Sequence, residues 1–404
     1  MGHNKQTDNS PYWAPWPVFG DREIQAVGDV LASGRVNYWT GPHGREFERE
    51  YAESLGCDHA VAVSNGTVAL ELALEAVGVG HGDEVVVPCR SFLASASAIA
   101  ARGAIPIFAD VDRDSGNVTA DTVAAVLSPR TRGVLVVHLA GWPCDMAPIL
   151  SLAAQTGLKV IEDCAQAHGA EYDGRQVGTL GDVAAFSFCQ DKILSTGGEG
   201  GLIVTDDESI WRRAWSYKDH GKDYDAVHAP SKGAVFRYVH GGLGTNWRLT
   251  EMQSVLGRIV LQELPGWLIE RRRNASMLAA RLGTMEALRV PEPRLGFAHS
   301  YYKFYAYVRP ECLASDWSRD RIAAEISSRG VPCGSGACPE IYLEAAFDGT
   351  GWRPAKRLPV ARELGETSLM FQVHPGLGTV QMDHTADVVS DVLRQATGRL
   401  AAAA

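Results

Sequence analysis

Seven short apolar runs, rich in Val and Ile and mostly without polar alternation, recur along the first half of the chain. Such runs are typical of strands that are buried on both faces of a sheet. Helical patterns separate most of them, for example over residues 67–78 and 147–157. This alternation predicts an α/β fold with a mostly parallel, seven-stranded sheet, in which ligands bind beyond the carboxyl ends of the strands. The runs span residues 60–64, 84–88, 105–111, 133–141, 159–165, 183–188 and 201–205.

The same patterning divides the chain into three parts. Residues 1–20 combine tryptophans with prolines and predict an extended N-terminal arm that packs on a partner subunit. Residues 21–265 contain all seven runs and form the predicted large α/β domain. Residues 266–404 mix one strand-like and several helical segments, which predicts a smaller C-terminal α+β domain.

Several individual elements are also predicted. Apolar residues spaced for one helix face indicate an amphipathic helix over 44–55. A second helical region covers about 250–283 and is expected to bend near Pro265. In the smaller domain, residues 301–309 read as a strand and residues 318–330 as a helix with a glycine after its end.

The charge and the apolar content exclude several classes of protein. A formal net charge of −10 disfavours nonspecific nucleic-acid binding, which needs clustered Lys and Arg. No apolar run approaches the roughly 20 residues of a membrane-spanning helix, and the N-terminus lacks the order of a signal peptide. We therefore expect a cytoplasmic protein with no nucleic-acid or membrane partner.

The eight cysteines have irregular spacing, and several lie in apolar runs where a free thiol packs as a small hydrophobe. Cys333 and Cys338 are close together, but no second pair or nearby His completes a zinc-binding set. We expect structural cysteines and no metal site.

The first segment with candidate chemistry is residues 64–67, Ser-Asn-Gly-Thr, which follows a predicted strand and opens a helix. A helix N-terminus offers free N–H groups and a positive dipole end, which suit a phosphate. Gly66 would allow close backbone approach, and Thr67 could add a hydroxyl. The alternative is an ordinary helix cap, because Ser, Asn and Thr are all good capping residues.

The second segment begins with Glu162 and Asp163, two acids at the end of a buried run. Asp163 could hold a proton on a ring nitrogen, since an ion pair in a low dielectric favours both charged forms. Gln166 could donate or accept a hydrogen bond at a ring hydroxyl. The alternative is a turn with capping residues, but an acid at the carboxyl end of a strand lies where α/β sites form.

The third segment, residues 186–201, contains Ser187 and Lys192 ahead of a glycine-rich turn. Lys192 could be a surface lysine, yet its apolar flanks indicate burial, and a desolvated lysine becomes a usable amine nucleophile. Ser187 could supply a further hydroxyl to a phosphate. The three segments together describe one ligand with a phosphate, a ring nitrogen and a group that a lysine can attack.

These motifs resemble those of the DegT/DnrJ/EryC1/StrS family of sugar aminotransferases, a group with the fold-type I architecture of pyridoxal-phosphate enzymes. The resemblance covers about residues 14–395. It is most specific in the F-S-F-x-x-x-K run ahead of G-E-G-G, and it also rests on residues 64–74, 88–99, 162–170 and 244–257.

The resemblance implies pyridoxal 5′-phosphate as cofactor, with pyridoxamine 5′-phosphate as intermediate, and it assigns roles to individual residues. Lys192 is implied to form the Schiff base, and Asp163 to pair with the ring nitrogen. Gln166 is implied to lie near the ring hydroxyl. The residues implied to bind the phosphate are Gly66, Thr67 and Ser187.

Two further residues gain roles from the resemblance alone. Phe92 falls where the family places an aromatic side chain that stacks on the cofactor ring, although core packing is an alternative. Asn246 is implied to reach the phosphate of the neighbouring subunit, which implies a homodimer with shared active sites. The alternative for Asn246 is a cap at the entry of the following helix.

The implied activity is transamination, because dehydratase members of the family replace the lysine with His and this chain keeps Lys192. The donor is expected to be glutamate or glutamine. The expected acceptor is a keto sugar, carried on a nucleotide, in polysaccharide or secondary-metabolite biosynthesis. A keto-cyclitol of an aminoglycoside-type pathway is an alternative acceptor, and a non-catalytic cofactor-binding regulator is an alternative function.

Overall fold

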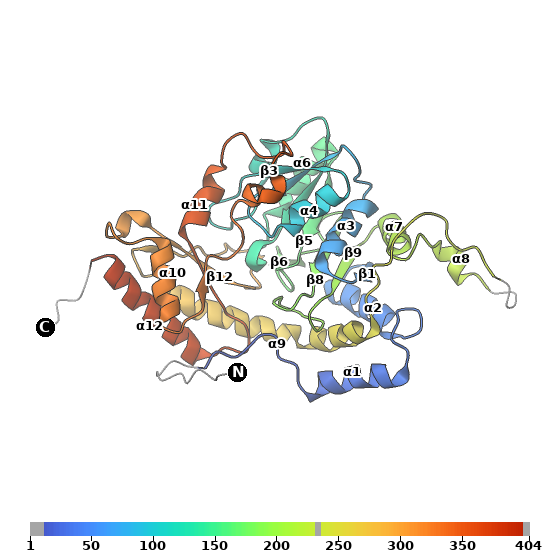
Figure 1. The fold of residues 1–404 in the computed structure, drawn as a ribbon, viewed down its shortest axis with the longest axis horizontal. Coiled ribbons are helices and arrows are strands. Elements are labelled where there is room, and N and C mark those ends of the chain that lie inside the picture. Colours follow the sequence, from blue (N-terminus) through green and yellow to red (C-terminus); the bar gives the residue numbers. More distant parts are fainter. Residues whose placement is uncertain (1–11, 231–235, 399–404) are drawn as a thin grey trace.

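The structure, a computed structural model, describes residues 12–230 and 236–398. Its larger sheet has seven strands in the order β1-β9-β8-β5-β4-β2-β3 (Figure 1). All seven predicted strands are confirmed, because each apolar run contributes one strand to this sheet. The strands are β1 His59–Val63, β2 Glu84–Pro88, β3 Ile105–Ala109, β4 Thr131–Val137, β5 Lys159–Asp163, β8 Val183–Ser187 and β9 Gly201–Thr205.

The larger sheet is parallel at every pairing except those of β9, which runs antiparallel to both β1 and β8. The other six strands therefore point the same way, and their carboxyl ends share one edge. The predicted mostly parallel, seven-stranded α/β fold is confirmed.

Helices cover both faces of this sheet, which explains why its strands lack polar alternation. Val85 and Val87 face one helical layer, whereas Val86 between them faces the other. The first layer consists of α3 Gly66–Ala76, α4 Ala94–Ala101 and α7 Glu208–Lys218. The second consists of α2 His43–Leu55, α5 Ala120–Ala124, α6 Met146–Thr156 and the long helix α9 Glu251–Leu282.

Helix α9 spans 32 residues and contains Pro265 without ending there. Because proline has no N–H, the carbonyl of Leu261 lacks its usual intrahelical donor. The first half of α9 packs against α1 (Asp21–Ser33) and α2, and its second half packs against α12 (Thr379–Ala396), as Figure 1 shows. The expected division at residues 265 and 266 falls inside this helix, and the domain boundary stays a prediction.

A smaller antiparallel sheet, with the order β10-β12-β14-β13, forms beside the second half of α9. Helices α10 (Arg319–Ser328) and α12 pack on it, while α11 (Pro359–Thr367) lies nearer the larger sheet. The predicted strand within 301–309 and helix within 318–330 are confirmed. The strands of this sheet are β10 Leu288–Arg289, β12 Phe304–Val308, β13 Cys333–Gly334 and β14 Ser368–Phe371. Besides short 3-10 helices, the structure also has helix α8 Tyr224–His228 and a three-stranded sheet of β6 Glu171–Tyr172, β7 Arg175–Gln176 and β11 Phe297–Ala298.

The described part of the N-terminal arm, residues 12–20, packs on its own chain. The Trp16 ring makes an edge contact with Trp267 at 4.9 Å between centroids and stacks on His374 at 5.6 Å. Its indole N–H donates a hydrogen bond of 2.8 Å to the carbonyl of Lys192. The arm thus joins the smaller sheet to the segment that follows β8. No helix among the described residues is long and apolar enough to cross a membrane.

Candidate active site

The segments that the sequence singles out follow strands of the same direction, so they meet at one edge of the larger sheet. This is the edge at which ligands bind in folds of this kind. The segments carry Gly66 after β1, Phe92 after β2, Asp163 at the end of β5, and Ser187 and Lys192 at and beyond the end of β8.

Gly66 and Ser187 lie directly against each other at this edge. A Cβ on Gly66 would lie 2.5 Å from Ser187 Cβ and 2.8 Å from Ser187 Oγ, so only glycine fits. Asn65 caps α3 by accepting a 3.0 Å hydrogen bond from the N–H of Val68. The capping interpretation is therefore correct. The N–H groups of Gly66 and Thr67 still have no acceptor inside the helix, and such groups bind phosphate.

Asp163 is a buried carboxylate, with 5% of its surface exposed. Its Oδ2 accepts a 2.8 Å hydrogen bond from the Ser95 hydroxyl, and its Oδ1 accepts a 3.1 Å bond from the N–H of Ala165. Burial raises the pKa of Asp163, and the positive charge of Lys192 acts in the opposite direction. A cation placed against this carboxylate would favour its ionised form, which suits a protonated ring nitrogen.

Gln166 and Phe92 present groups that are open to a ligand. Gln166 Oε1 accepts a 2.8 Å hydrogen bond from the N–H of Ala140, and no bond to its Nε2 is found among the described residues. Phe92 is 68% exposed. The alternative of core packing for Phe92 is wrong, and its free face can stack on a flat ring.

Lys192 is held in place by two oxygen atoms. Its side chain is 16% exposed, and its Nζ lies 3.5 Å from both the Tyr302 hydroxyl and Asp191 Oδ1. The Tyr302 hydroxyl also donates a hydrogen bond to Asp191. Burial raises the pKa of Asp191, but the charge of Lys192 and the bond from Tyr302 lower it overall. The alternative of a surface lysine is wrong, because the Lys192 side chain is largely buried and lies beside an ionised carboxylate.

A model of the DegT/DnrJ/EryC1/StrS aminotransferase family matches residues 17–390. The chain belongs to this family. An aminotransferase from Psychrobacter cryohalolentis, known from its X-ray structure, is 50% identical in sequence and superimposes with a TM-score of 0.93. The match covers 95% of this chain and 100% of that one. The predicted family and the predicted transaminase class are both confirmed.

Two curated relatives of this aminotransferase have named acceptors. UDP-N-acetyl-3-dehydro-alpha-D-glucosamine 3-aminotransferase from Acidithiobacillus ferrooxidans is 34% identical over 373 residues, which cover 92% of this chain and 94% of the relative. L-glutamine:2-deoxy-scyllo-inosose aminotransferase from Streptomyces kanamyceticus is 40% identical over 279 residues, which cover 67% of this chain and 64% of the relative. The relatives thus include a nucleotide-sugar enzyme and a cyclitol enzyme.

The structure adds residues to the site of the aminotransferase that the sequence did not single out. Tyr302 reaches Lys192 from 110 positions away, a separation that no local pattern reveals. His168 is fully buried, donates its Nε2 proton to the Ser187 carbonyl at 2.9 Å and accepts from the Tyr51 hydroxyl at 2.8 Å. Burial lowers the pKa of His168 to about 4, so the ring stays neutral and fixes the backbone at Ser187.

Asn246 lies on an exposed segment ahead of α9, where its backbone pairs with that of Asp219. The cap of α9 is Thr250, whose side chain and that of Gln253 form a capping box. The alternative of a helix-entry cap for Asn246 is therefore wrong. Its implied contact with the phosphate of a neighbouring subunit stays a prediction.

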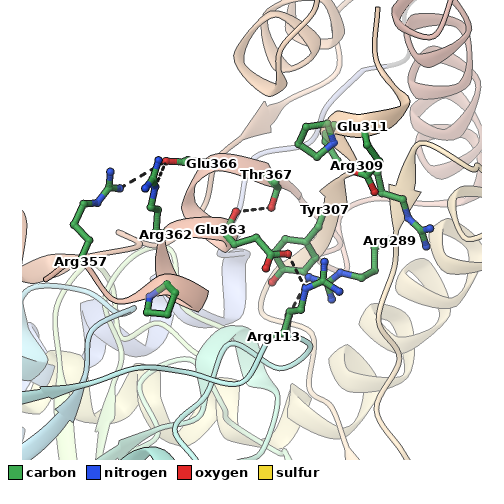
Figure 2. A pocket seen from close by; sticks show the side chains of 13 residues that line it. Arg113, Arg289, Tyr307, Arg309, Glu311, Arg357, Arg362, Glu363, Glu366 and Thr367 are labelled. Carbon is green, nitrogen blue, oxygen red and sulfur yellow. Dashed lines mark hydrogen bonds and ion pairs between the residues drawn. The ribbon is translucent and has the colours of Figure 1, made fainter.

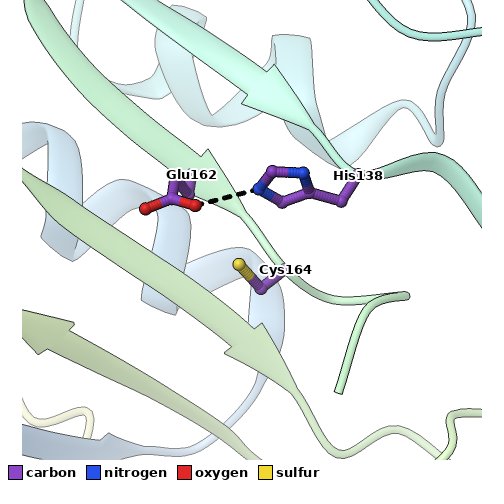
Figure 3. A group of neighbouring side chains, drawn as sticks. All are labelled: His138, Glu162 and Cys164. Carbon is purple, nitrogen blue, oxygen red and sulfur yellow. Dashed lines mark hydrogen bonds and ion pairs between the residues drawn. The ribbon is translucent and has the colours of Figure 1, made fainter. Parts of the chain in front are cut away.

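His138, Glu162 and Cys164 lie close enough together to be considered as metal ligands (Figure 3). His138 Nδ1 accepts from the N–H of Cys144 at 2.9 Å, so its Nε2 carries the proton and donates it to Glu162 at 3.0 Å. Three backbone N–H groups also donate to Glu162, and burial raises the pKa of the Cys164 thiol, whereas a metal requires the thiolate. We assign this cluster to holding β4 and β5 together.

A separate cavity of about 660 Å³ lies between α11 and the start of the smaller sheet, with five arginines around it (Figure 2). Four of the five form ion pairs with carboxylates: Arg113, Arg289, Arg357 and Arg362. Its positive charge is thus largely compensated by the protein itself.

Proposed function

We propose that this aminotransferase uses pyridoxal 5′-phosphate to move an amino group from glutamate or glutamine to a keto sugar carried on a nucleotide. The observation that carries the proposal is the position of Lys192, a largely buried amine within electrostatic reach of Asp163 and 3.5 Å from the Tyr302 hydroxyl. The relative from A. ferrooxidans spans nearly the whole chain and is named for a nucleotide-linked keto sugar, which supports the proposed acceptor.

The residues of the site fit each polar group of this cofactor. The contact between Gly66 and Ser187 leaves a helix N-terminus and a hydroxyl for the phosphate. Asp163 offers a buried carboxylate to the ring nitrogen, and the Gln166 amide can bond a ring hydroxyl. The exposed ring of Phe92 offers a stacking surface.

When bound, the cofactor supplies an electron sink for the negative charge that develops at the α-carbon of the donor. Asp163 holds the proton on the ring nitrogen. Lys192 would supply the amine that holds the aldehyde, and the same amine would move a proton at the donor α-carbon. Tyr302 and Asp191 orient this amine, because both oxygens lie 3.5 Å from its nitrogen.

A keto-cyclitol is the second candidate acceptor, because the S. kanamyceticus relative is 40% identical and is named for one. The same Lys192 and Asp163 would serve either acceptor. Membership of an aminotransferase family argues against the alternative of a non-catalytic regulator. We also propose a homodimer in which Asn246 reaches the phosphate held by the partner.

Borohydride reduction followed by peptide mass spectrometry tests the role of Lys192, because reduction fixes an amine–aldehyde linkage. We expect the label on Lys192 in the wild-type protein and no label in Lys192→Ala. The matched control is Lys159→Ala, which removes an exposed lysine paired with Asp182 and should leave the labelling unchanged. A label that persists on a different lysine would refute the assignment.

The acceptor is tested by turnover with a nucleotide-linked keto sugar and with a free keto-inositol, each with glutamate and with glutamine as donor. Turnover of the nucleotide-linked sugar supports the proposal. Turnover of the keto-inositol alone would replace it with the cyclitol alternative.

A further inference from the structure

A second cavity, of about 240 Å³, lies beside the Lys192 segment, between the N-terminal arm, α9 and the smaller sheet. At about 30 Å³ per water molecule it has room for roughly eight waters, or for a small organic acid. The residues that matter for its chemistry are Trp16, Asp191, Arg271, Tyr302, Lys303 and His374.

Two basic side chains line this cavity, and neither is paired with a carboxylate within residues 12–230 and 236–398. Arg271 is 1% exposed, and its Nη1 donates only to the backbone carbonyls of Tyr301 and Tyr302, at 3.2 and 3.3 Å. Its Nε has no hydrogen-bond partner in the described part of the chain. Lys303 has no hydrogen bond or ion pair with a described residue, and its Nζ lies 4.8 Å from the centroid of the Tyr302 ring.

The other polar groups of the cavity compensate this charge only in part, because Asp191 attracts Lys303 but lies closer to Lys192. Asp191 is the carboxylate among the lining residues, and it already binds Lys192 and the Tyr302 hydroxyl. Burial lowers the pKa of His374 to about 4, so its ring is neutral and adds no charge. The cavity therefore carries an excess of positive charge from Arg271 and Lys303, which an anion would compensate.

The position of the cavity indicates which anion. Tyr302 and Asp191 line it, and the Tyr302 hydroxyl and Asp191 Oδ1 each lie 3.5 Å from Lys192 Nζ. The α-carboxylate of an amino acid is one bond from the carbon at which Lys192 acts. A donor whose α-carbon faces Lys192 can therefore place its carboxylate on this side of the amine.

We propose that the cavity is the subsite for the α-carboxylate of the amino-acid donor, with Lys303 and Arg271 as the groups that bind it. This inference rests on the proposed transamination. The larger cavity of Figure 2 does not offer a comparable site, because four of its five arginines are already paired with carboxylates.

The test uses Lys303→Gln, because Arg271 also bonds the backbone and its replacement would change the fold. The cofactor-loaded enzyme is titrated with glutarate, a dicarboxylate without an amine, by calorimetry. Loss of one charged hydrogen-bond donor should weaken glutarate binding and raise the KM for glutamate about ten- to a hundredfold. The KM for the keto acceptor should stay unchanged.

Two matched variants accompany it. Lys303→Arg keeps the charge and should bind glutarate nearly as the wild type does. Lys356→Gln removes an exposed lysine ahead of α11 and should change neither constant.

Unchanged glutarate binding in Lys303→Gln would overturn the subsite, as would a rise confined to the KM of the keto acceptor. The proposed function fails separately, if the wild-type protein carries the cofactor on Lys192 but no amino acid reacts with it. The glutarate titration still decides the subsite in that case, since it needs no turnover.

Discussion

Replacing Gly66 with alanine tests whether the contact between α3 and β8 forms the phosphate-binding site. The added Cβ would lie 2.5 Å from Ser187 Cβ and 3.2 Å from Ser187 Cα. Carbon atoms prefer separations of about 3.5–4.0 Å, so the start of α3 and Ser187 must move apart by about 1 Å. The backbone N–H groups of Gly66 and Thr67 would move with the helix.

A displacement of about 1 Å is enough to lose a hydrogen bond between this helix end and a phosphate. A hydrogen bond to a charged group contributes about 1.5–3 kcal/mol. Losing one such bond should weaken the affinity for pyridoxal 5′-phosphate about ten- to a hundredfold. The affinity for pyridoxal, which has no phosphate, should change little.

The assay is a titration of cofactor-free protein with each of the two aldehydes, followed by absorbance. The informative quantity is the ratio of the two dissociation constants, because a general loss of folding would affect both. Gly28→Ala is the matched control, since a Cβ at this helical position has no atom within 4 Å. If Gly66→Ala keeps the wild-type ratio, the helix end does not bind the phosphate and the reasoning is wrong.

Three further predictions address the stacking residue, the partner subunit and the response to acid. Phe92→Ala should weaken cofactor binding about three- to tenfold, because a stacking contact contributes about 0.5–1.5 kcal/mol. The melting temperature of the cofactor-free protein should stay within a degree or two, because Phe92 is 68% exposed. A large drop in melting temperature would mean that the ring supports the fold. Mixing inactive Asn246→Ala and inactive Lys192→Ala chains should restore activity. One site of the mixed dimer then combines Lys192 of the first chain with Asn246 of the second. No recovery after verified subunit exchange would exclude shared sites. Burial holds the pKa of His168 at about 4 in the folded protein, whereas a histidine in the unfolded chain has a pKa of about 6.5. On acidification the unfolded chain therefore binds the proton first. The free energy of unfolding should fall as the pH drops from about 6.5 to about 4. His168→Gln should make that fall shallower in thermal melts recorded against pH, and identical slopes in both proteins would contradict the assignment.

The larger sheet could be predicted because burial on both faces leaves a simple sequence signature. Even there, the run over 133–141 extends past the strand, since β4 ends at Val137. The next side chain, His138, turns toward Glu162 and the following residues form a short 3-10 helix. The apolar composition continues through this turn because its residues are buried, so hydropathy alone could not locate the end of the strand.

The smaller sheet was harder to predict, because its strands are short and partly formed by long-range pairing. β13 consists of Cys333 and Gly334 alone, which pair with Phe371 and Met370 of β14. Two residues carry no periodicity, and only the folded chain brings them to their partners.

The residues of the candidate site also differ in how far the sequence alone could predict their roles. Asp163 and Lys192 lie in continuous motifs next to strands, so their chemistry could be inferred from neighbouring residues. Tyr302 and Lys303 lie in a strand-like run and appear as ordinary sheet residues. Their role depends on the packing of the smaller sheet against the segment after β8, which no local pattern encodes.

The docking of the N-terminal arm has a consequence for biosynthesis. Trp16 bonds the Lys192 carbonyl and stacks on His374, and Gln381 donates a 2.9 Å hydrogen bond to the carbonyl of Tyr12. A ribosome makes the arm well before His374 and Gln381, and Gln381 follows Tyr12 by 369 residues. The nascent chain therefore cannot close this side of its active centre until both partners have been made.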